Sequence, residues 1–300
     1  MTLHHIVRTL GGDLYQGGLR ANVPAPGHSA EDRSVSLLLT EGRLVVHSFG
    51  GADWRCVRDA LRIAGFIDDR GRLTGGGQSS ANLVTPDRRL RRAAADRLWA
   101  GGVELGSGTL AGRYLALRGV EGGAGSLNLC HHPEAPISVY RPGSHHRPAL
   151  MARISDAADR LTAVELTYLD PNGRRAARLR VSRKTVGQVP AGAAVRLAPG
   201  APRMLVGEGV ITTLAAMRRF DLPGWALRSA DNLAAWTPPD DVRHVLIAAD
   251  NGRVGLGAAA RLRARLLDAG LSATVRAPAP AFGDWSDAVC AGDGSEKEGR

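Results

Sequence analysis

Residues 203–220 read RMLVGEGVITTLAAMRRF, and residues 244–270 read HVLIAADNGRVGLGAAARLRARLLDAG. Each stretch is a short apolar run, typical of a buried strand, followed by a longer run whose apolar residues have helical spacing. Two further strand-like segments are GWALRSA at 224–230 and SATVRAP at 272–278. Strands and helices that alternate in this way predict a parallel sheet wrapped by helices, which is an α/β domain.

Acidic residues follow the predicted strands. Glu208 comes directly after MLVG, Asp250 comes directly after VLIAA, and Asp284 and Asp287 follow the last strand in GDWSD. Ligands of open α/β sheets gather at the carboxyl ends of the parallel strands, so we expect these acids on one rim. Clustered carboxylates repel one another unless a cation compensates. Magnesium takes a few carboxylates and leaves room for phosphate, so the pattern predicts a Mg2+ or Mn2+ site.

The segment in front of this domain divides into an N-terminal module, a linker and a second α+β unit. SVSLLL and RLVVHSF, separated by TEG, predict a β-hairpin, and a helix is expected from Trp54 to Ile63. Its buried face is expected to hold Val57, Leu61 and Ala64. The glycine- and serine-rich stretch 74–86 cannot form a packed element and predicts a flexible linker.

After the linker, a strongly basic helix is expected over residues 87–100, with Leu90, Ala94 and Leu98 as its buried stripe. The pieces ALMARIS, LTAVELTYLD, AARLRVSRKTVG and AAVRLAP, with a Pro-Asn-Gly turn, predict a small antiparallel sheet. The histidine-rich stretch around His131, His132, His145 and His146 is interpreted as a loop. The expected boundaries are 1–73 for an N-terminal module, 74–86 for the linker, 87–200 for an α+β unit, 201–291 for the α/β domain and 292–300 for a disordered tail.

Charge and composition point to a polyanionic partner. The formal net charge is +10 and comes mostly from arginine, which can donate two hydrogen bonds to one phosphate. An arginine-rich, alanine-rich composition would also produce this charge without any such partner. No stretch approaches about 18 consecutive apolar residues, so we expect a cytoplasmic protein without membrane contact. Three scattered cysteines predict buried thiols rather than a disulfide framework.

Three ordered motifs carry a resemblance to a known family. VGEGVITTLAAM, AADNGRVGLGAAARL and PAFGDWSDAV resemble the topoisomerase–primase (Toprim) domains of bacterial primases. The likeness is closer to the primase-like proteins of plasmids, phages and integrated elements, and it extends upstream over most of the chain. It implies catalytic roles for Glu208, Asp250 and Asp287. It also implies a basic stretch that lines the path of template and nucleotide, formed by Arg174, Arg175, Arg183 and Lys184.

The sequence departs from this family pattern in two places. Gly252 stands where the second acid of an Asp-x-Asp motif is expected, which should weaken metal binding. The N-terminal module resembles the zinc ribbon that precedes Toprim domains, but its ligand positions hold Val23, His28, Ser48 and Ala52. Only His28 of these could bind zinc, and a structural zinc site needs four ligands, so no zinc is expected.

These features leave three hypotheses for function. The first is primase-like, Mg-dependent nucleotidyl transfer on single-stranded DNA during replication of a mobile element. The second is a catalytically weakened protein that binds nucleic acid or contacts the replisome. The third is a Toprim-type metal-dependent nuclease. Single-stranded DNA or another nucleic acid is the expected partner, with a replicative helicase as a further candidate. The sequence has no Walker phosphate loop, so no ATP-driven helicase motor is expected in this chain.

Overall fold

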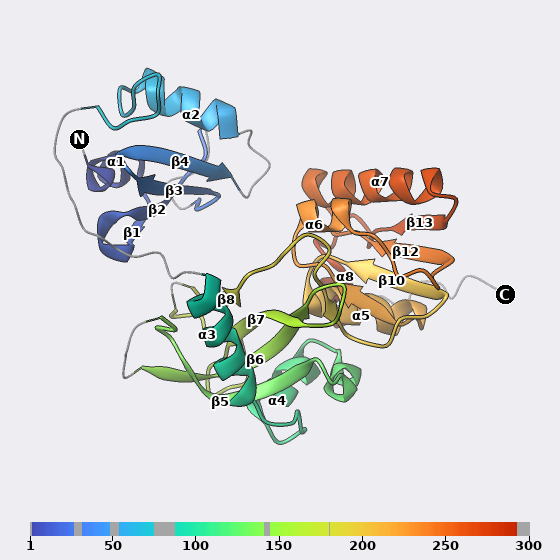
Figure 1. Ribbon diagram of the computed structural model, residues 1–300. Coiled ribbons are helices and arrows are strands. Elements are labelled where there is room, and N and C mark those ends of the chain that lie inside the picture. Colours follow the sequence, from blue (N-terminus) through green and yellow to red (C-terminus); the bar gives the residue numbers. More distant parts are fainter. Residues whose placement is uncertain are drawn as a thin grey trace. The chain divides into compact units, whose positions relative to one another are not determined.

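The computed structural model describes residues 2–26, 32–48, 54–74, 88–140, 145–179 and 181–292. The chain divides into two compact units, Met1–Thr85 and Pro86–Arg300, each with its own core (Figure 1). The glycine-rich part of the predicted linker and the predicted disordered tail from residue 293 lie outside the described residues. Within the part of the chain that the structure describes, no helix is long and apolar enough to span a membrane.

The described residues of the first unit form an antiparallel sheet with two helices. Its elements are α1 (Leu3–Leu10), β1 (Asp13–Tyr15), a 3-10 turn η1 (Gln16–Gly18), β2 (Arg20–Val23), β3 (Val35–Thr40), β4 (Arg43–Ser48) and α2 (Trp54–Ile63). The strands pair in the order β1-β2-β3-β4. The predicted hairpin is β3–β4, closed between Thr40 and Arg43 by Glu41 and Gly42, which both have positive φ as a tight hairpin turn requires.

The packing of α2 corrects part of the sequence prediction. Val57 and Leu61 are buried as expected, whereas Ala64 is exposed because α2 ends at Ile63 and the chain turns at Gly65. Trp54 is 42% exposed at the start of this helix. The resemblance of this unit to a zinc ribbon stays a prediction, since His28 and Ala52 lie outside the described residues.

The second unit begins with two helices and an antiparallel sheet. Its elements are α3 (Arg88–Ala100), α4 (Leu110–Leu117), a 3-10 turn η2 (Glu121–Gly125), β5 (Leu129–Pro136), β6 (His146–Ser155), β7 (Leu161–Tyr168) and β8 (Arg183–Gly187). The strands pair in the order β5-β6-β7-β8, so the predicted antiparallel sheet is confirmed. Helix α3 packs on β7 and β8 through Ala94, Ala95 and Leu98, but Leu90 is 55% exposed and does not belong to the buried stripe.

The loop interpretation of the histidine-rich stretch is wrong in part. His131 and His132 lie on β5 and pair with Leu150 and Ala149, and His146 opens β6. Pairing along β6 gives the backbone of this proline- and histidine-rich segment its hydrogen bonds, which local composition does not reveal. A register irregularity between His132 and Ala135 accommodates the intervening residues.

The C-terminal part of the second unit is the predicted parallel sheet. Its elements are β9 (Val195–Arg196), β10 (Arg203–Gly207), α5 (Val210–Phe220), β11 (Gly224–Ala226), α6 (Ala230–Ala235), β12 (His244–Ala248), α7 (Arg253–Asp268), β13 (Ser272–Arg276) and α8 (Trp285–Cys290). The strand order is β13-β12-β10-β11-β9, and every pair is parallel except β11–β9. Strand β9 therefore joins this sheet as an antiparallel edge, rather than the small antiparallel sheet in which AAVRLAP was expected.

Alternation along the strands divides the two faces of the parallel sheet. Met204, Val206 and Ile247 pack under α6 and α7, whereas Leu205 and Leu246 belong to a second core on the side of α5 and α8 (Figure 1). This second core also includes buried residues of the preceding part of the chain, namely Leu115, Leu129, Leu150 and Ile154. The antiparallel sheet and the parallel sheet are therefore packed as one body.

Candidate metal centre at the rim of the parallel sheet

Glu208 and Asp250 lie at the same edge of the parallel sheet. Strands β10 and β12 are neighbours in a register that pairs Gly207 with Ala248, so Glu208 directly follows one strand and Asp250 lies two residues beyond the other. Both side chains are partly buried. The structure thus places these acids on one rim, at the carboxyl ends of adjacent parallel strands.

Burial and mutual repulsion both act on these two carboxylates. Burial raises the pKa of Glu208, and the charges of Asp250 and Asp231 raise it further. Burial also raises the pKa of Asp250 to about 6, with added repulsion from Asp284 and Asp287, against a hydrogen bond from Thr212 that acts to lower it. The charges of the four predicted acids are therefore coupled through Asp250.

Thr212 is a buried polar residue that fixes Asp250. It lies in the first turn of α5, where its Oγ1 donates to Asp250 Oδ1 at 3.0 Å and accepts from the backbone N–H of Trp285 at 3.2 Å. One hydroxyl thus connects α5, the end of β12 and the start of α8. Sequence reasoning missed this residue, although a threonine four positions after Glu208, in the mostly apolar first part of the helix, was a visible signal.

Asp284 and Asp287 already make contacts within the protein. Asp284 caps α8 by accepting from the backbone N–H of Asp287 at 2.9 Å. Asp287 is exposed and lies 3.6 Å from Arg118 Nη2, an ion pair that joins α8 to the end of α4. These carboxylates add negative charge beside Asp250, but their contacts already determine part of their orientation.

The position of the missing second acid has an unusual backbone. Gly252 has φ 137° and ψ 152°, a conformation that is accessible essentially to glycine alone. A Cβ added there would meet nothing within 4 Å, so the obstacle to an acid is the backbone rather than space. Asn251 does not replace it, because its side-chain amide donates to the carbonyl groups of Pro278, Ala279 and Phe282.

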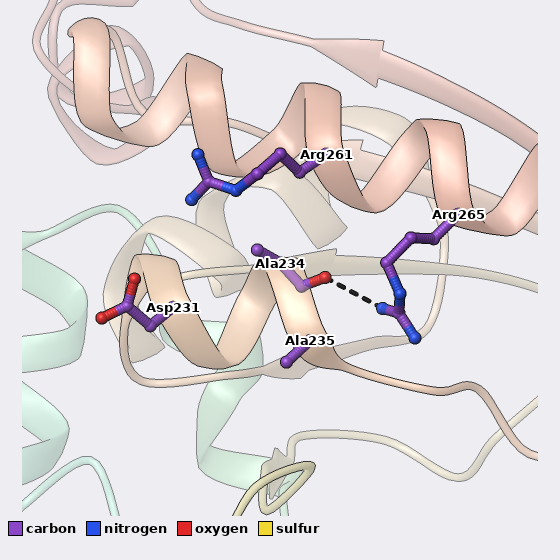
Figure 2. A pocket seen from close by; sticks show the side chains of 5 residues that line it. All are labelled: Asp231, Ala234, Ala235, Arg261 and Arg265. Carbon is purple, nitrogen blue, oxygen red and sulfur yellow. Dashed lines mark hydrogen bonds between the residues drawn. The ribbon is translucent and has the colours of Figure 1, made fainter.

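A fifth acid at this rim was missed from the sequence. Asp231 lies in the first turn of α6 and raises the pKa of Glu208. The available signal was its place after β11, the third parallel strand that ends at the same rim. Figure 2 shows it beside an open groove of about 390 Å³ between α6 and α7, lined by Asp231, Ala234, Ala235, Arg261 and Arg265. Arg265 is held there by hydrogen bonds to the carbonyl groups of Ala234 and Trp236.

The donor set fits a sparsely coordinated hard cation. Carboxylate oxygens are the ligands that Mg2+ prefers, and Mg2+ commonly uses one or two carboxylates together with water and substrate phosphate. No group of three or more His, Cys, Asp or Glu side chains is close enough to hold a metal ion among the described residues. Glu208 and Asp250 would therefore be the main protein ligands, with Asp284 and Asp287 contributing charge from nearby.

The predicted basic residues lie on a different part of the unit. Arg174 and Arg175 are exposed in the connection between β7 and β8, and Arg183 is exposed on β8, which packs against β7 and α3. Lys184 is half-buried: its Nζ donates to the carbonyl group of Ile137 at 2.5 Å and lies 5.7 Å from the ring centre of Tyr168. The side chains of three of the four candidates are thus exposed to solvent, whereas Lys184 makes intramolecular contacts.

Comparison with known proteins assigns the two parts of the second unit to families. Residues 203–294 match the model of the Toprim domain, and residues 89–197 match a domain of unknown function, DUF7146. A search of curated proteins found no match. The sheet with the acidic rim lies in the segment that matches the Toprim model, and the predicted α/β fold class is confirmed.

Several solved structures that resemble the chain are primases. The primase fragment of the bacteriophage T7 primase-helicase is 18% identical over 60% of this chain and 70% of that chain, with a TM-score of 0.43. The Aquifex aeolicus primase (zinc-binding and RNA polymerase domains) is 13% identical over 96% and 79%, with a TM-score of 0.46. The Escherichia coli primase catalytic core is 15% identical over 67% and 75%, with a TM-score of 0.43. The chain is similar to these primases, and its residues 203–294 match the Toprim model.

Proposed function

We propose that the protein is a primase-like nucleotidyltransferase that uses Mg2+ or Mn2+ to join nucleotides on a single-stranded DNA template. The observation that supports this most directly is the pair of strand-end carboxylates, Glu208 and Asp250, on adjacent parallel strands of a Toprim domain. Both have raised pKa values, as expected for acids that a bound cation would compensate. The motif resemblance favours a role in replication of a mobile element, with a helicase as a separate partner.

In this proposal the chain's own residues hold the divalent ion and orient its ligands. Glu208 and Asp250 would hold the divalent ion, Thr212 keeps Asp250 in one orientation, and Asp287 supplies further negative charge. When bound, the ion would offset the charge of the incoming triphosphate and favour attack of the 3′-hydroxyl oxygen on the α-phosphorus, with pyrophosphate as leaving group. Exposed arginines on the antiparallel sheet would contact template phosphates, which is the part of the affinity that salt weakens.

A second candidate is a nucleic-acid-binding protein with weakened or no catalysis. Gly252 favours it, because the backbone there has a conformation that an aspartate would adopt only with strain. A site with two main carboxylates has less charge to hold an ion than one with an additional acid. The Toprim domain, the basic charge and the exposed arginines are equally compatible with this function.

One assay separates these functions from each other and from a nuclease. The protein is incubated with circular single-stranded DNA, labelled nucleotides and MgCl2 or MnCl2, beside Glu208→Gln and a control, Glu104→Gln, whose side chain is exposed. Oligonucleotides made by the wild type and Glu104→Gln but not by Glu208→Gln support the proposal. Binding without synthesis favours the second candidate, loss of template favours the nuclease, and synthesis that survives Glu208→Gln excludes the proposed site.

A further inference from the structure

A buried ion pair connects the two sheets of the second unit. Glu165 lies on β7 of the antiparallel sheet and is 3% exposed. Its carboxylate pairs with the guanidinium of Arg228, which follows β11 of the parallel sheet and whose side chain is 11% exposed. Burial lowers the pKa of Arg228 to about 10, so its guanidinium is still charged at neutral pH. Neither residue was expected from the sequence to have a role.

The backbone of Arg228 is hydrogen-bonded to the backbone of Glu208, one of the two proposed metal ligands. The N–H of Arg228 donates to the carbonyl group of Glu208 at 2.8 Å, and the N–H of Leu227 donates to that of Gly207 at the same distance. Arg228 makes this bond with φ +73°, which is uncommon for a residue other than glycine. The surrounding structure must therefore hold this residue in place.

The same segment sets the start of α6. Ser229 caps that helix by accepting from the N–H of Asn232, and the side-chain amide of Asn232 donates to the carbonyl groups of Leu227 and Ala193 at 2.7 Å. Asp231, whose charge acts on Glu208, lies in this first turn. The position of residues 227–232 therefore affects both the backbone of Glu208 and a charge beside its carboxylate.

Stability alone gives no reason to place an ion pair between the two sheets. Moving two charges out of water is costly, and an apolar pair of similar size often stabilises a fold equally well or better. Residues that contact metal ligands, in contrast, commonly set the orientation of those ligands, on which metal affinity depends. We propose that the Glu165–Arg228 pair is a positioning device for the metal centre: it holds residues 227–232 against the end of β10 and thereby places Glu208. This inference rests on the proposed function in that an ion is expected to bind at Glu208.

The test replaces both members of the pair, because a single replacement would leave a buried charge without its partner. In the full chain, Glu165→Leu is combined with Arg228→Met, and Mn2+ affinity is measured by calorimetry beside the thermal midpoint. Hydrogen exchange is followed in peptides that cover residues 204–210 and 224–233. The expected result is Mn2+ binding that is about tenfold weaker or more, with faster exchange in both peptides and a midpoint close to that of the wild type.

The control is a second ion pair of the same unit, between Arg147 and Asp170, whose Nη1 and Oδ1 atoms are 2.7 Å apart. Arg147→Met combined with Asp170→Leu should leave Mn2+ affinity and exchange of the two peptides unchanged. Unchanged affinity and exchange in the Glu165/Arg228 variant would show that the pair does not position Glu208.

Failure of the inference can be told apart from failure of the proposed function. If the wild type does not bind Mn2+, the proposed function fails, while exchange in residues 204–210 and 224–233 still decides whether the pair holds this segment. If the double variant does not fold, Arg228→Lys replaces it, because lysine keeps the charge but lacks the planar fork of donors. It should also weaken Mn2+ binding and speed exchange, and wild-type values for both would overturn the inference.

Discussion

The acidic rim and the basic edge of the second unit differ in how their charged side chains are held. At the rim, Glu208 and Asp250 are partly buried and have raised pKa values, and Asp250 accepts a hydrogen bond from the buried Thr212. At the basic edge, Arg174, Arg175 and Arg183 are exposed side chains around an edge strand. Under the proposed function, the rim would depend on exact placement, since a cation would be bound at short range, whereas the edge would act through charge over longer distances.

The largest expected effect is loss of metal binding at the rim. Asp250→Asn removes one of two main carboxylates while it keeps the side-chain size, so Mn2+ affinity should fall roughly 100-fold. Calorimetry with Mn2+ measures this directly, and Asp268→Asn, which changes an exposed aspartate at the end of α7, is the matched control. Equal affinities in the wild type and Asp250→Asn would remove the rim from the metal site.

The raised pKa of Asp250 predicts an unusual pH dependence of stability in the metal-free protein. Its pKa is raised from 3.8 to about 6, so the folded state binds a proton more tightly than the unfolded state does. The stability contributed by this group is therefore complete below pH 4 and is lost as the pH rises to about 6, by roughly 1–3 kcal/mol. Urea denaturation of the wild type and Asp250→Asn at pH 4.5 and 7 checks this.

A bound divalent ion should reverse this pH dependence of stability. A divalent ion binds the ionised carboxylate, so protons compete with it and Mn2+ affinity should decline as the pH falls below 6. If Asp250→Asn shows the same loss of stability between pH 4.5 and 7 as the wild type, the carboxylate responsible lies elsewhere.

The sequence was sufficient to predict the parallel sheet and the rim at which its strands end. Apolar runs such as VLIAA, followed by long helices, have few alternative folds, and strand-end acids follow from that topology. The contacts that orient those acids were not predictable, because Thr212 meets Asp250 and Trp285 only through tertiary packing. The pairing of Glu165 with Arg228 spans 63 positions, and no local pattern indicates such a partner.

Burial at element ends was also poorly predicted from periodicity. Leu90 and Ala64 fit an apolar face by spacing, yet Leu90 lies in the first turn of α3, Ala64 lies beyond the end of α2, and both are exposed. Strand β5 was missed because its pairing with β6 overrides a histidine- and proline-rich composition. In each case the deciding quantity is the position of a neighbouring element rather than the segment's own residues.

Gly252 allows a smaller test of the rim. Gly252→Asp would add the acid of the family pattern, but at φ 137° the substitution should cost roughly 1–3 kcal/mol of unfolding free energy. Gly252→Ala should cost a similar amount, because the strain comes from any Cβ-bearing residue. Chemical denaturation of both variants measures this. A Gly252→Asp protein as stable as the wild type, with stronger Mn2+ binding, would show that the backbone readily accommodates a second acid.

Lys184 and Arg183 are neighbours on the basic edge that differ in their surroundings: Lys184 is half-buried and hydrogen-bonded, whereas Arg183 is exposed. Lys184→Met removes the bond to the Ile137 carbonyl and should lower the unfolding free energy by about 1 kcal/mol. Arg183→Met, next to it on β8 but exposed, should change stability by no more than about 0.5 kcal/mol. Thermal denaturation compares the two. The opposite ranking would contradict the assignment of Lys184 to a structural role.

The smallest expected effect concerns the exposed arginines of the turn before β8. If each contacts one phosphate of single-stranded DNA, Arg174→Ser combined with Arg175→Ser removes two counterion-releasing contacts, so the slope of log affinity against log salt should become shallower by about 1.4. Fluorescence anisotropy with a labelled oligonucleotide at several salt concentrations measures this slope. Arg261→Ser with Arg263→Ser removes the same charge from exposed positions of α7 and is the control. Equal slope changes in both variants would mean that the protein's overall charge, rather than this edge, carries the contact, because only local contacts distinguish two surfaces of equal charge.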